Sequence, residues 1–401
     1  MKSLRSLRCF AVFLLVLVDS VWAAPPVVSN VRVAQRPGTH LVDVLYNVSD
    51  PDGATPLTIS IAISDNAGQT YGVPVFTLSG AVGSGVLPGN DRLITWNAGQ
   101  DWPGRFNNQC RVRILADDGS APPAPQNMAY IPGGVFQMGD NFGEDTGAMP
   151  VHAVYVSPIF MDKFEVSREL WLEVYTWSLG NGYSMSGGSY RSNGHPVQTI
   201  TWYDAVKWCN ARSQKEGLTP CYYTDAAQTN VYRSGNLNLT NANVKWTANG
   251  YRLPTEAEWE KAARGGASGR RFPWGNTITH SQANYYSSAS FAYDTSPTRN
   301  YHPTYGSGTS PLGAFAANGY GLHDMAGNLW EWCWDWHDGA FYGKPEAAVD
   351  DPRGPSTVLA ARLLRGGAWF VVANVAQSSA RNGYTPGGAI NYFGFRCVRG
   401  L

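Results

Sequence analysis

The hydrophobic and polar positions divide the chain into two parts that follow different periods. Between residues 25 and 118, apolar residues alternate with polar ones over short runs, which predicts β-strands. These runs cover residues 27–33, 40–46, 57–63, 92–96 and 110–115. Gly, Pro, Asp and Asn residues separate them at turn positions. We therefore predict an all-β sandwich of the immunoglobulin or fibronectin type over residues 25–118.

A proline-rich segment, residues 119–127, ends this pattern and is predicted to be an extended linker. Beyond it, apolar residues recur at helical spacing in three places. Ser167, Thr201 and Thr255 each precede such a stretch and carry an oxygen that can cap a helix, the last within a capping box. The remainder of residues 128–401 has short apolar runs and long polar loops. We expect an α+β domain there, with little regular secondary structure.

The N-terminal pattern predicts export. Basic residues precede an apolar run at residues 10–18, and small residues around Ala23 resemble a cleavage site, so residues 1–24 are predicted to be a signal peptide. The run is too short to span a bilayer comfortably, and no later run approaches that length. We expect a secreted or periplasmic product without a membrane span.

Composition narrows the choice of partners and fold. The chain has 30 basic and 30 acidic residues, so its net charge is zero and we expect no nucleic-acid partner. It contains 44 glycines and 15 tryptophans, a combination that favours a loop-rich fold anchored by large aromatic side chains.

Characteristic segments follow the linker in a fixed order. They are residues 130–139 (YIPGGVFQMG), 161–167 (MDKFEVS), 195–197 (HPV), 251–260 (YRLPTEAEWE), 318–332 (NGYGLHDMAGNLWEW), 365–369 (RGGAW) and 394–397 (GFRC). Together they resemble the formylglycine-generating enzyme family, also called the sulfatase-modifying factor family, from Asn127 to Leu401. The resemblance implies a C-type-lectin-like fold for residues 128–401.

The resemblance also raises the question of oxidase chemistry. Characterised members oxidise a cysteine of a sulfatase to formylglycine and use copper(I) held by two thiolates, because soft Cu(I) prefers sulfur ligands. In the family these thiols follow the RGG segment, at positions that Val371 and Ala376 occupy here. Neither side chain binds copper, so we expect no copper and a non-oxidase binding or accessory module. A diverged sulfatase-activating oxidase, or another oxidative maturation enzyme, is the alternative.

A calcium site is implied by the same resemblance. Asp324, Gly327, Leu329 and Glu331 match a family calcium site residue by residue. Asp324 and Glu331 would supply carboxylates, and the other two residues would supply backbone carbonyls, which are ligands that calcium prefers. An ion-free turn with Glu331 in a salt bridge is the alternative.

The family also has a second calcium site and a substrate groove, and this sequence matches them less completely. A second calcium site would begin at Asn284 and Tyr285, but its acidic partner is not identifiable from the sequence. By family analogy Glu165 and Arg381 would line a substrate groove, where a peptide or glycan is the expected ligand.

The cysteine count is odd once the predicted signal peptide is removed, because one of the six cysteines lies within it. The resemblance implies a disulfide between Cys209 and Cys397. Cys221 and Cys333 form a second bridge in one interpretation, and a metal half-site formed by Cys333 with His337 is the alternative. Cys110 would then stay single and buried in the β-domain.

Other conspicuous residues have structural interpretations. Trp330, Trp332, Trp334 and Trp336 alternate along one segment, and we interpret them as buried anchors in preference to a carbohydrate platform. Four charged residues are expected to serve as ion-pair and capping groups, namely Arg252, Glu256, Glu258 and Arg396.

Overall fold

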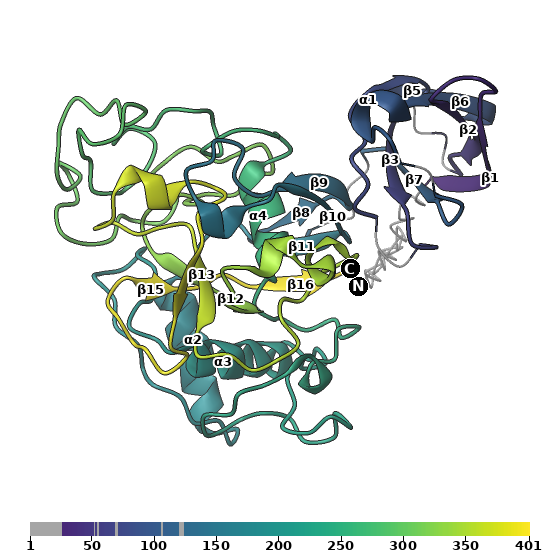
Figure 1. The fold of residues 1–401 in the computed structure, drawn as a ribbon. Coiled ribbons are helices and arrows are strands. Elements are labelled where there is room, and N and C mark those ends of the chain that lie inside the picture. Colours follow the sequence, from purple (N-terminus) through teal and green to yellow (C-terminus); the bar gives the residue numbers. More distant parts are fainter. Residues whose placement is uncertain (1–25, 52, 54–55, 69–70, 106, 120–123) are drawn as a thin grey trace, which may run out of the picture.

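The computed structural model describes residues 26–401 except 52, 54–55, 69–70, 106 and 120–123. Two bodies are visible, a smaller one formed by the N-terminal strands and a larger one formed by the rest of the chain (Figure 1). Within the described residues, no helix is long and apolar enough to cross a membrane.

The smaller body consists of two antiparallel sheets. Their orders are β1-β2-β6-β4 and β5-β3-β7. The elements are β1 (Val27–Gln35), β2 (Leu41–Ser49), β3 (Leu57–Ser64), β4 (Leu78–Gly80), β5 (Gly83–Val86), β6 (Gly89–Asn97), α1 (Ala98–Asp101) and β7 (Arg111–Asp117).

Alternation of side chains explains how these sheets form a core. In β2, Val44, Tyr46 and Val48 are buried while the residues between them are more exposed. Successive side chains of a strand point to opposite faces, so this alternation aims every second residue inward. Together with apolar residues of β3 and β6 they form one cluster. The predicted runs are confirmed as strands, and one helical turn, α1, follows β6.

The larger body combines helices with small sheets and long loops. Its sheet orders are β10-β9, β16-β11-β8 and β14-β13-β12-β15. The helices and strands are β8 (Met128–Ile131), β9 (Gly134–Met138), β10 (His152–Val156), β11 (Ile159–Asp162), α2 (Arg168–Leu179), α3 (Trp202–Lys215), α4 (Glu256–Arg264), β12 (Trp330–Trp336), β13 (Arg362–Arg365), β14 (Asn382–Tyr384), β15 (Phe393–Gly394) and β16 (Val398–Gly400). Short 3-10 turns are η1 (Thr146–Ala148), η2 (Asn241–Asn243), η3 (Phe341–Gly343), η4 (Pro345–Ala348) and η5 (Ala373–Ala376). The α+β prediction with little regular structure is confirmed for this body.

The predicted helix starts are confirmed by their caps. Ser167 accepts a hydrogen bond from the backbone N–H of Leu170 at the start of α2. Thr201 and Thr255 begin α3 and α4, and each forms a complete capping box. These caps satisfy N–H groups that have no partner within the helix.

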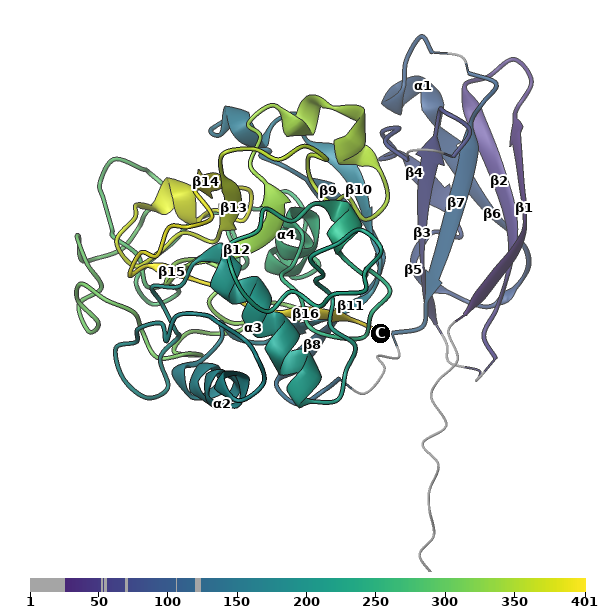
Figure 2. The ribbon, with the colours of Figure 1, turned by 90° about the horizontal axis from the view of Figure 1, so that it is seen from below.

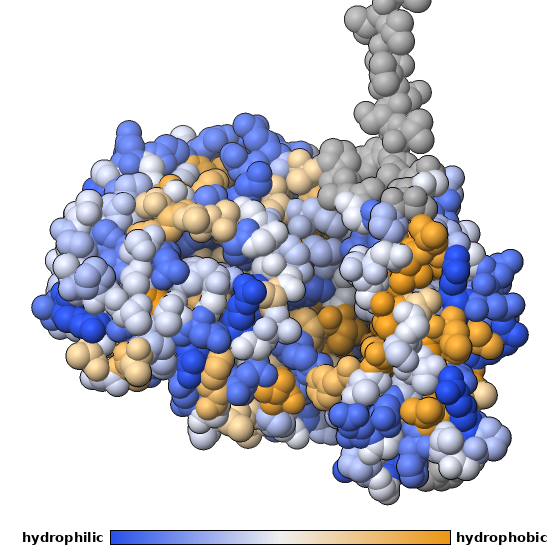
Figure 3. All heavy atoms as spheres, turned by 90° about the horizontal axis from the view of Figure 1, so that it is seen from above, coloured by the Kyte–Doolittle hydropathy of each residue, from blue (hydrophilic) through white to orange (hydrophobic). Residues whose placement is uncertain are grey.

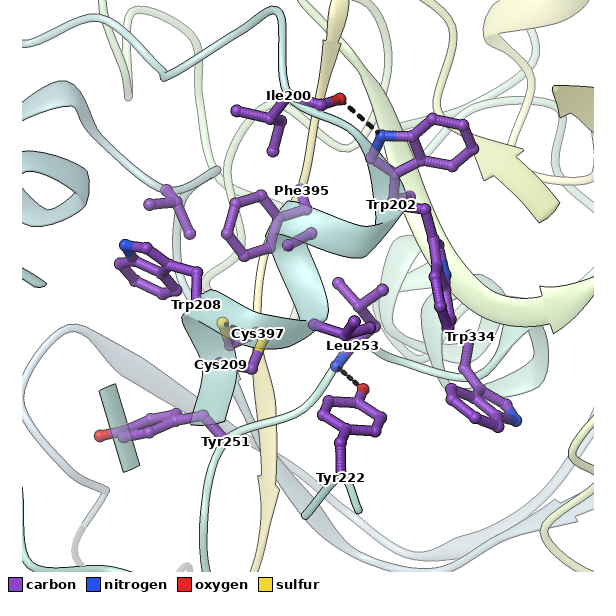
Figure 4. Packing of buried hydrophobic residues seen from close by; sticks show 14 of the residues in the cluster. Ile200, Trp202, Trp208, Cys209, Tyr222, Tyr251, Leu253, Trp334, Phe395 and Cys397 are labelled. Carbon is purple, nitrogen blue, oxygen red and sulfur yellow. Dashed lines mark hydrogen bonds between the residues drawn. The ribbon is translucent and has the colours of Figure 1, made fainter. Parts of the chain in front are cut away.

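A tryptophan-rich cluster forms the main core of the larger body. Trp171 and Trp208 stack with ring centroids 5.7 Å apart, and α3 and β12 contribute further rings (Figure 4). The alternating tryptophans of β12 are all buried, which confirms that they are anchors. Glu331, Cys333 and Asp335 on the other face of β12 are buried as well. The strand therefore has no solvent-exposed face that could serve as a carbohydrate platform.

The two bodies lie side by side (Figure 2). Arg113 of β7 makes contacts that reach from the smaller body to the larger one. Its guanidinium lies 3.9 Å from the ring centroid of Tyr71 and 5.2 Å from that of Tyr155. It also forms an ion pair with Asp350. Tyr155 and Asp350 belong to the larger body, so one arginine joins both bodies.

The smaller body exposes several large apolar side chains. Figure 3 shows apolar side chains gathered over this body on the face seen from above. The exposed residues are Val27, Val31, Val33, Phe76, Leu87 and Leu93. Scattered exposed apolar side chains are common on protein surfaces, and these carry no functional assignment.

Candidate functional site

The two predicted cation segments touch each other. Gly327 has a left-handed φ of 82°, and a Cβ at this position would lie 2.3 Å from the carbonyl oxygen of Asn284. The backbone N–H of Asn328 donates to that same carbonyl at 2.8 Å. Only glycine permits this close approach. Segments 284–285 and 324–331, far apart in the sequence, therefore form one loop cluster.

Two oxygens in this loop cluster are buried without a hydrogen-bond partner. Asp324 accepts from the N–H of Gly313 at 3.0 Å through Oδ2, but its Oδ1 has no partner. Asn284 donates to the carbonyl of Gly308 at 3.0 Å, and its Oδ1 also lacks a partner. Burial raises the pKa of Asp324 to about 6. Buried polar oxygens are normally satisfied, and a hard cation is one group that would satisfy these.

Glu331 is engaged by other side chains. Its two oxygens accept from the guanidinium of Arg396, both at 2.7 Å, and one also accepts from Trp259 Nε1 at 2.9 Å. This is the geometry of the ion-pair alternative raised by the sequence. Each carboxylate oxygen has more than one lone pair, so the pairing is compatible with a further ligand on the same group.

Glu165 supports the loop cluster and also borders a cleft beside the start of α2, although its side chain is largely buried. It is 2% exposed, and its carboxylate accepts from the N–H of Leu329 at 3.0 Å and from Asn328 Nδ2 at 2.6 Å. Burial, and then the nearby charges of Asp324 and Glu331, raise its pKa well above the ordinary value. Sequence reasoning missed this supporting role, because the contacts span more than 160 residues.

Carboxylates outnumber the guanidinium in this cluster. Three buried carboxylates, those of Glu165, Asp324 and Glu331, lie around the single guanidinium of Arg396. Burying unpaired negative charge is costly, so protons or a cation must compensate it. In the described part of the chain, no three His, Cys, Asp or Glu side chains form a metal cage. Calcium here would thus depend on backbone carbonyls, which fits the predicted roles of Gly327 and Leu329.

The second predicted calcium position fits less well. The hydroxyl of Tyr285 donates to Asp294 at 2.6 Å, and the Tyr285 carbonyl lies 3.2 Å from His280 Nε2. Asp294 is the nearby acid that the sequence did not identify, and Ser287 and Arg299 also donate to it. This acid is therefore already surrounded by donors.

Apolar packing occupies the positions of the two family thiols. Ala376 is fully buried in a cluster with Phe272 and Ile278. Val371 packs on the edge of the tryptophan-rich core, and its carbonyl accepts from the N–H of Tyr286 at 2.9 Å. The local environment around both positions provides carbon contacts and no sulfur ligand.

Aromatic rings continue from the Val371 position across the neighbouring loops. Successive ring centroids are 5.1, 5.8, 5.6 and 4.1 Å apart. The rings, called the aromatic row below, are those of Tyr286, Tyr301, Trp369, Phe370 and Tyr392. Tyr301 is 40% exposed. The row therefore offers at least one accessible ring beside the family's catalytic position.

The expected groove role of Arg381 is wrong. Its side chain is 2% exposed, and it donates to both oxygens of Glu256 at 2.6 and 2.8 Å. Arg365 pairs with Glu256 and Glu260 in the same network. These contacts bury Arg381 as a structural ion pair. The four residues predicted to be ion-pair and capping groups do form ion pairs: besides Glu256, Arg252 pairs with Glu258, and Arg396 pairs with Glu331.

The described cysteines are all free thiols. Cys209 of α3 and Cys397 face each other in the core, with their sulfur atoms 3.6 Å apart (Figure 4). The expected partners are thus adjacent but not joined in the structure. Cys221 lies in the tryptophan-rich cluster and Cys333 in a second cluster, and both are free thiols, so the second bridge is not formed in the structure. Cys110 is partly exposed, contrary to the expected burial.

This loop-rich fold, with its capped helices and tryptophan-rich central strand, defines the class of formylglycine-generating-enzyme-like domains. Residues 117–401 match the model of the "Sulfatase-modifying factor enzyme 1-like domain". The chain belongs to the sulfatase-modifying factor family.

Relatives within this family carry different names. A chaperone protein LppX from Paenibacillus barcinonensis is 32% identical over 281 residues, covering 68% of this chain and 89% of the relative. A formylglycine-generating enzyme from Thermomonospora curvata is 33% identical over 297 residues, covering 68% and 93%. Among solved structures, Treponema denticola variable protein 1 aligns with a TM-score of 0.52 at 30% identity, covering 68% and 95%. CarF aligns with a TM-score of 0.53 at 26% identity, covering 69% and 99%.

Proposed function

We propose that this chain is an exported, calcium-stabilised binding or accessory protein without copper oxidase activity. The observation that carries the proposal is the pair Val371 and Ala376, which place hydrocarbon where the family oxidases have two thiolates. Copper(I) needs soft ligands, and neither residue can supply one. A relative named as a chaperone is about as similar to this chain as one named as an enzyme, so family membership alone does not imply oxidation.

The aromatic row supports a binding role at this same place. Exposed tyrosine rings stack well on sugar faces and on apolar peptide side chains, and their hydroxyls add hydrogen bonds. Tyr301 is an exposed member of the row. Its ring contacts that of Trp369, which is only 9% exposed. A peptide or glycan is accordingly the ligand class that we propose for this surface.

Incubation with a sulfatase-motif peptide, copper and a thiol reductant tests the absence of oxidase activity. We expect no aldehyde product by mass spectrometry, because no thiolate pair is present to bind copper(I). The formylglycine-generating enzyme of Thermomonospora curvata serves as the positive control. Appearance of formylglycine with this chain would favour the rival function, a diverged sulfatase-activating oxidase.

Calcium binding is tested by thermal unfolding with and without a chelator. We expect EDTA to lower Tm and added calcium to restore it, because the ion would satisfy the buried Oδ1 of Asp324. The Asp324→Ala variant should lose this response, while Asp225→Ala, in an exposed loop of the same body, should keep it. An identical Tm in EDTA and in calcium would rule the site out.

Export and oxidation can be examined together by intact mass. In a secretion-competent host we expect a product cleaved after Ala23 or Ala24. In an oxidising compartment the adjacent Cys209 and Cys397 are expected to form a disulfide. The mass should then rise by about two hydrogen masses on reduction, and not in the Cys209→Ser variant. A full-length, unoxidised product from the culture medium or periplasm would contradict both expectations.

A further inference from the structure

A cleft of about 600 Å³ lies where the linker enters the larger body. Its walls come from residues 125–127 of the linker, the end of β11, the start of α2, the end of α3 and the strand β16. This volume is typical of small-ligand sites. Val371 and the aromatic row are not among the described residues that line it. The cleft is therefore distinct from the surface proposed above.

Arg399 places an unsatisfied positive group in the wall. It lies on β16 opposite Phe160 of β11, and its Nε is buried without a hydrogen-bond partner. Among the residues that the structure describes, no carboxylate pairs with it. The other wall arginine, Arg212, contrasts with it, because it pairs with Asp162 at 2.8 Å and with Glu216 at 3.3 Å. The Arg399 guanidinium borders the cleft 5.7 Å from the ring centroid of Tyr251, and a planar guanidinium without a carboxylate partner is suited to bind one through two hydrogen bonds.

The cleft also has an apolar part. Apolar and aromatic side chains line part of the cleft, namely Phe164, Val166, Leu170, Tyr251 and Leu312.

The start of α2 contributes acidic groups to the wall. Glu169 is 48% exposed, and its closest cation, Arg168, is 3.9 Å away. Glu173, by contrast, is already paired with Lys215. Of the other wall carboxylates, Asp162 and Glu216 pair with Arg212, and Glu165 accepts from Asn328 and Leu329. The cleft thus offers an anion-binding group in Arg399, an apolar wall and, in Glu169, an acidic group with spare capacity.

We propose that this cleft binds a short peptide with a free C-terminal carboxylate. The carboxylate pairs with Arg399, an apolar side chain contacts Phe164 and Leu170, and a basic group lies near Glu169. The volume fits a few residues, and a ligand with both charges matches the mixed lining. This inference does not depend on the function proposed for the aromatic row.

Isothermal titration calorimetry with the tripeptide Lys-Leu-Ala tests the proposal on the full mature chain. We expect measurable binding of the free acid and at least about tenfold weaker binding of its C-terminal amide, because charge-assisted hydrogen bonds to the carboxylate are lost. Arg399→Gln should weaken binding of the acid by a similar factor. Arg111→Gln, on an exposed strand position of the smaller body, is the matched control and should leave binding unchanged.

Two comparisons make the result decisive. If the carboxylate contacts Arg399, amidation should cause little further loss in Arg399→Gln, so the two changes should not be additive. Circular dichroism and Tm check that the variant is folded, and Arg399→Lys should recover part of the affinity if it is. Absence of binding to the unmodified chain overturns the proposal. So does equal affinity for acid and amide, or loss of binding in Tyr301→Ala, which would place the peptide on the aromatic row.

Discussion

Many charged residues in the larger body are buried, and most of them are paired with one another. Arg365 donates to both Glu256 and Glu260, and Arg381 donates to Glu256. Asp335 differs from these residues because it pairs with none of the cations that the structure describes. One of its carboxylate oxygens accepts a hydrogen bond from the uncharged backbone N–H of Glu256 at 2.8 Å. Burial, and then repulsion from Glu256, raises the pKa of Asp335 to about 8. This carboxyl is therefore mostly protonated at neutral pH.

Asp335→Asn should remove a pH-dependent loss of stability. Folding raises the pKa of Asp335 from 3.8 to about 8. Its contribution to the free energy of unfolding is therefore fully present below about pH 4 and is lost as the pH rises through about 8. An asparagine keeps the acceptor for the Glu256 N–H and carries no charge. Denaturant unfolding between pH 5 and 9 should show wild type falling relative to the variant.

Asp91→Asn, on the exposed surface of the smaller body, is the control and should parallel wild type. Parallel curves for Asp335→Asn and wild type across this range would show that Asp335 is ionised in the folded protein.

At the level of elements, helix starts were predictable and short strands were not. The caps at Ser167, Thr201 and Thr255 are local patterns, in which a side chain bonds the backbone three residues ahead. Strands β4 and β5 were missed because they contain only three or four residues, many of them glycine or serine. Their pairing to longer neighbours keeps them extended, and local preference alone does not.

Thr255→Ala should destabilise the larger body by about 1 kcal/mol, which is typical for loss of a threonine cap. The threonine hydroxyl accepts from the N–H of Glu258, and the alanine variant leaves this buried donor without a partner. Urea unfolding monitored by tryptophan fluorescence measures the change. Thr224→Ala, in an exposed loop, is the control and should change stability by less. Equal stability of both variants would mean that packing alone holds the start of α4.

At the scale of the whole molecule, the two bodies are joined through a small contact. Arg113 stacks between Tyr71 and Tyr155 and pairs with Asp350. Cation–π contacts of this kind are worth roughly 0.5–2 kcal/mol each, depending on how far the charge is desolvated. Each body has its own core cluster, so each core should survive the loss of this contact.

Arg113→Ala should therefore loosen the arrangement without unfolding either body. We expect a larger radius of gyration by small-angle scattering and faster protease cleavage within residues 119–127. Arg111→Ala, two positions away on the same strand, is the control. If scattering and cleavage match those of wild type, contacts other than Arg113 hold the bodies together.

The sequence by itself determined the strand runs, the helix starts, the family and the absence of thiols at Val371 and Ala376. Each of these follows from residue identity or from spacing over a few positions, where backbone geometry sets the pattern. Tertiary structure alone decided that Arg381 is a buried partner of Glu256, 125 residues away, and not a groove residue. It also brought Gly327 against Asn284. Such contacts depend on how distant loops pack, and side-chain burial in a loop-rich fold follows no short period.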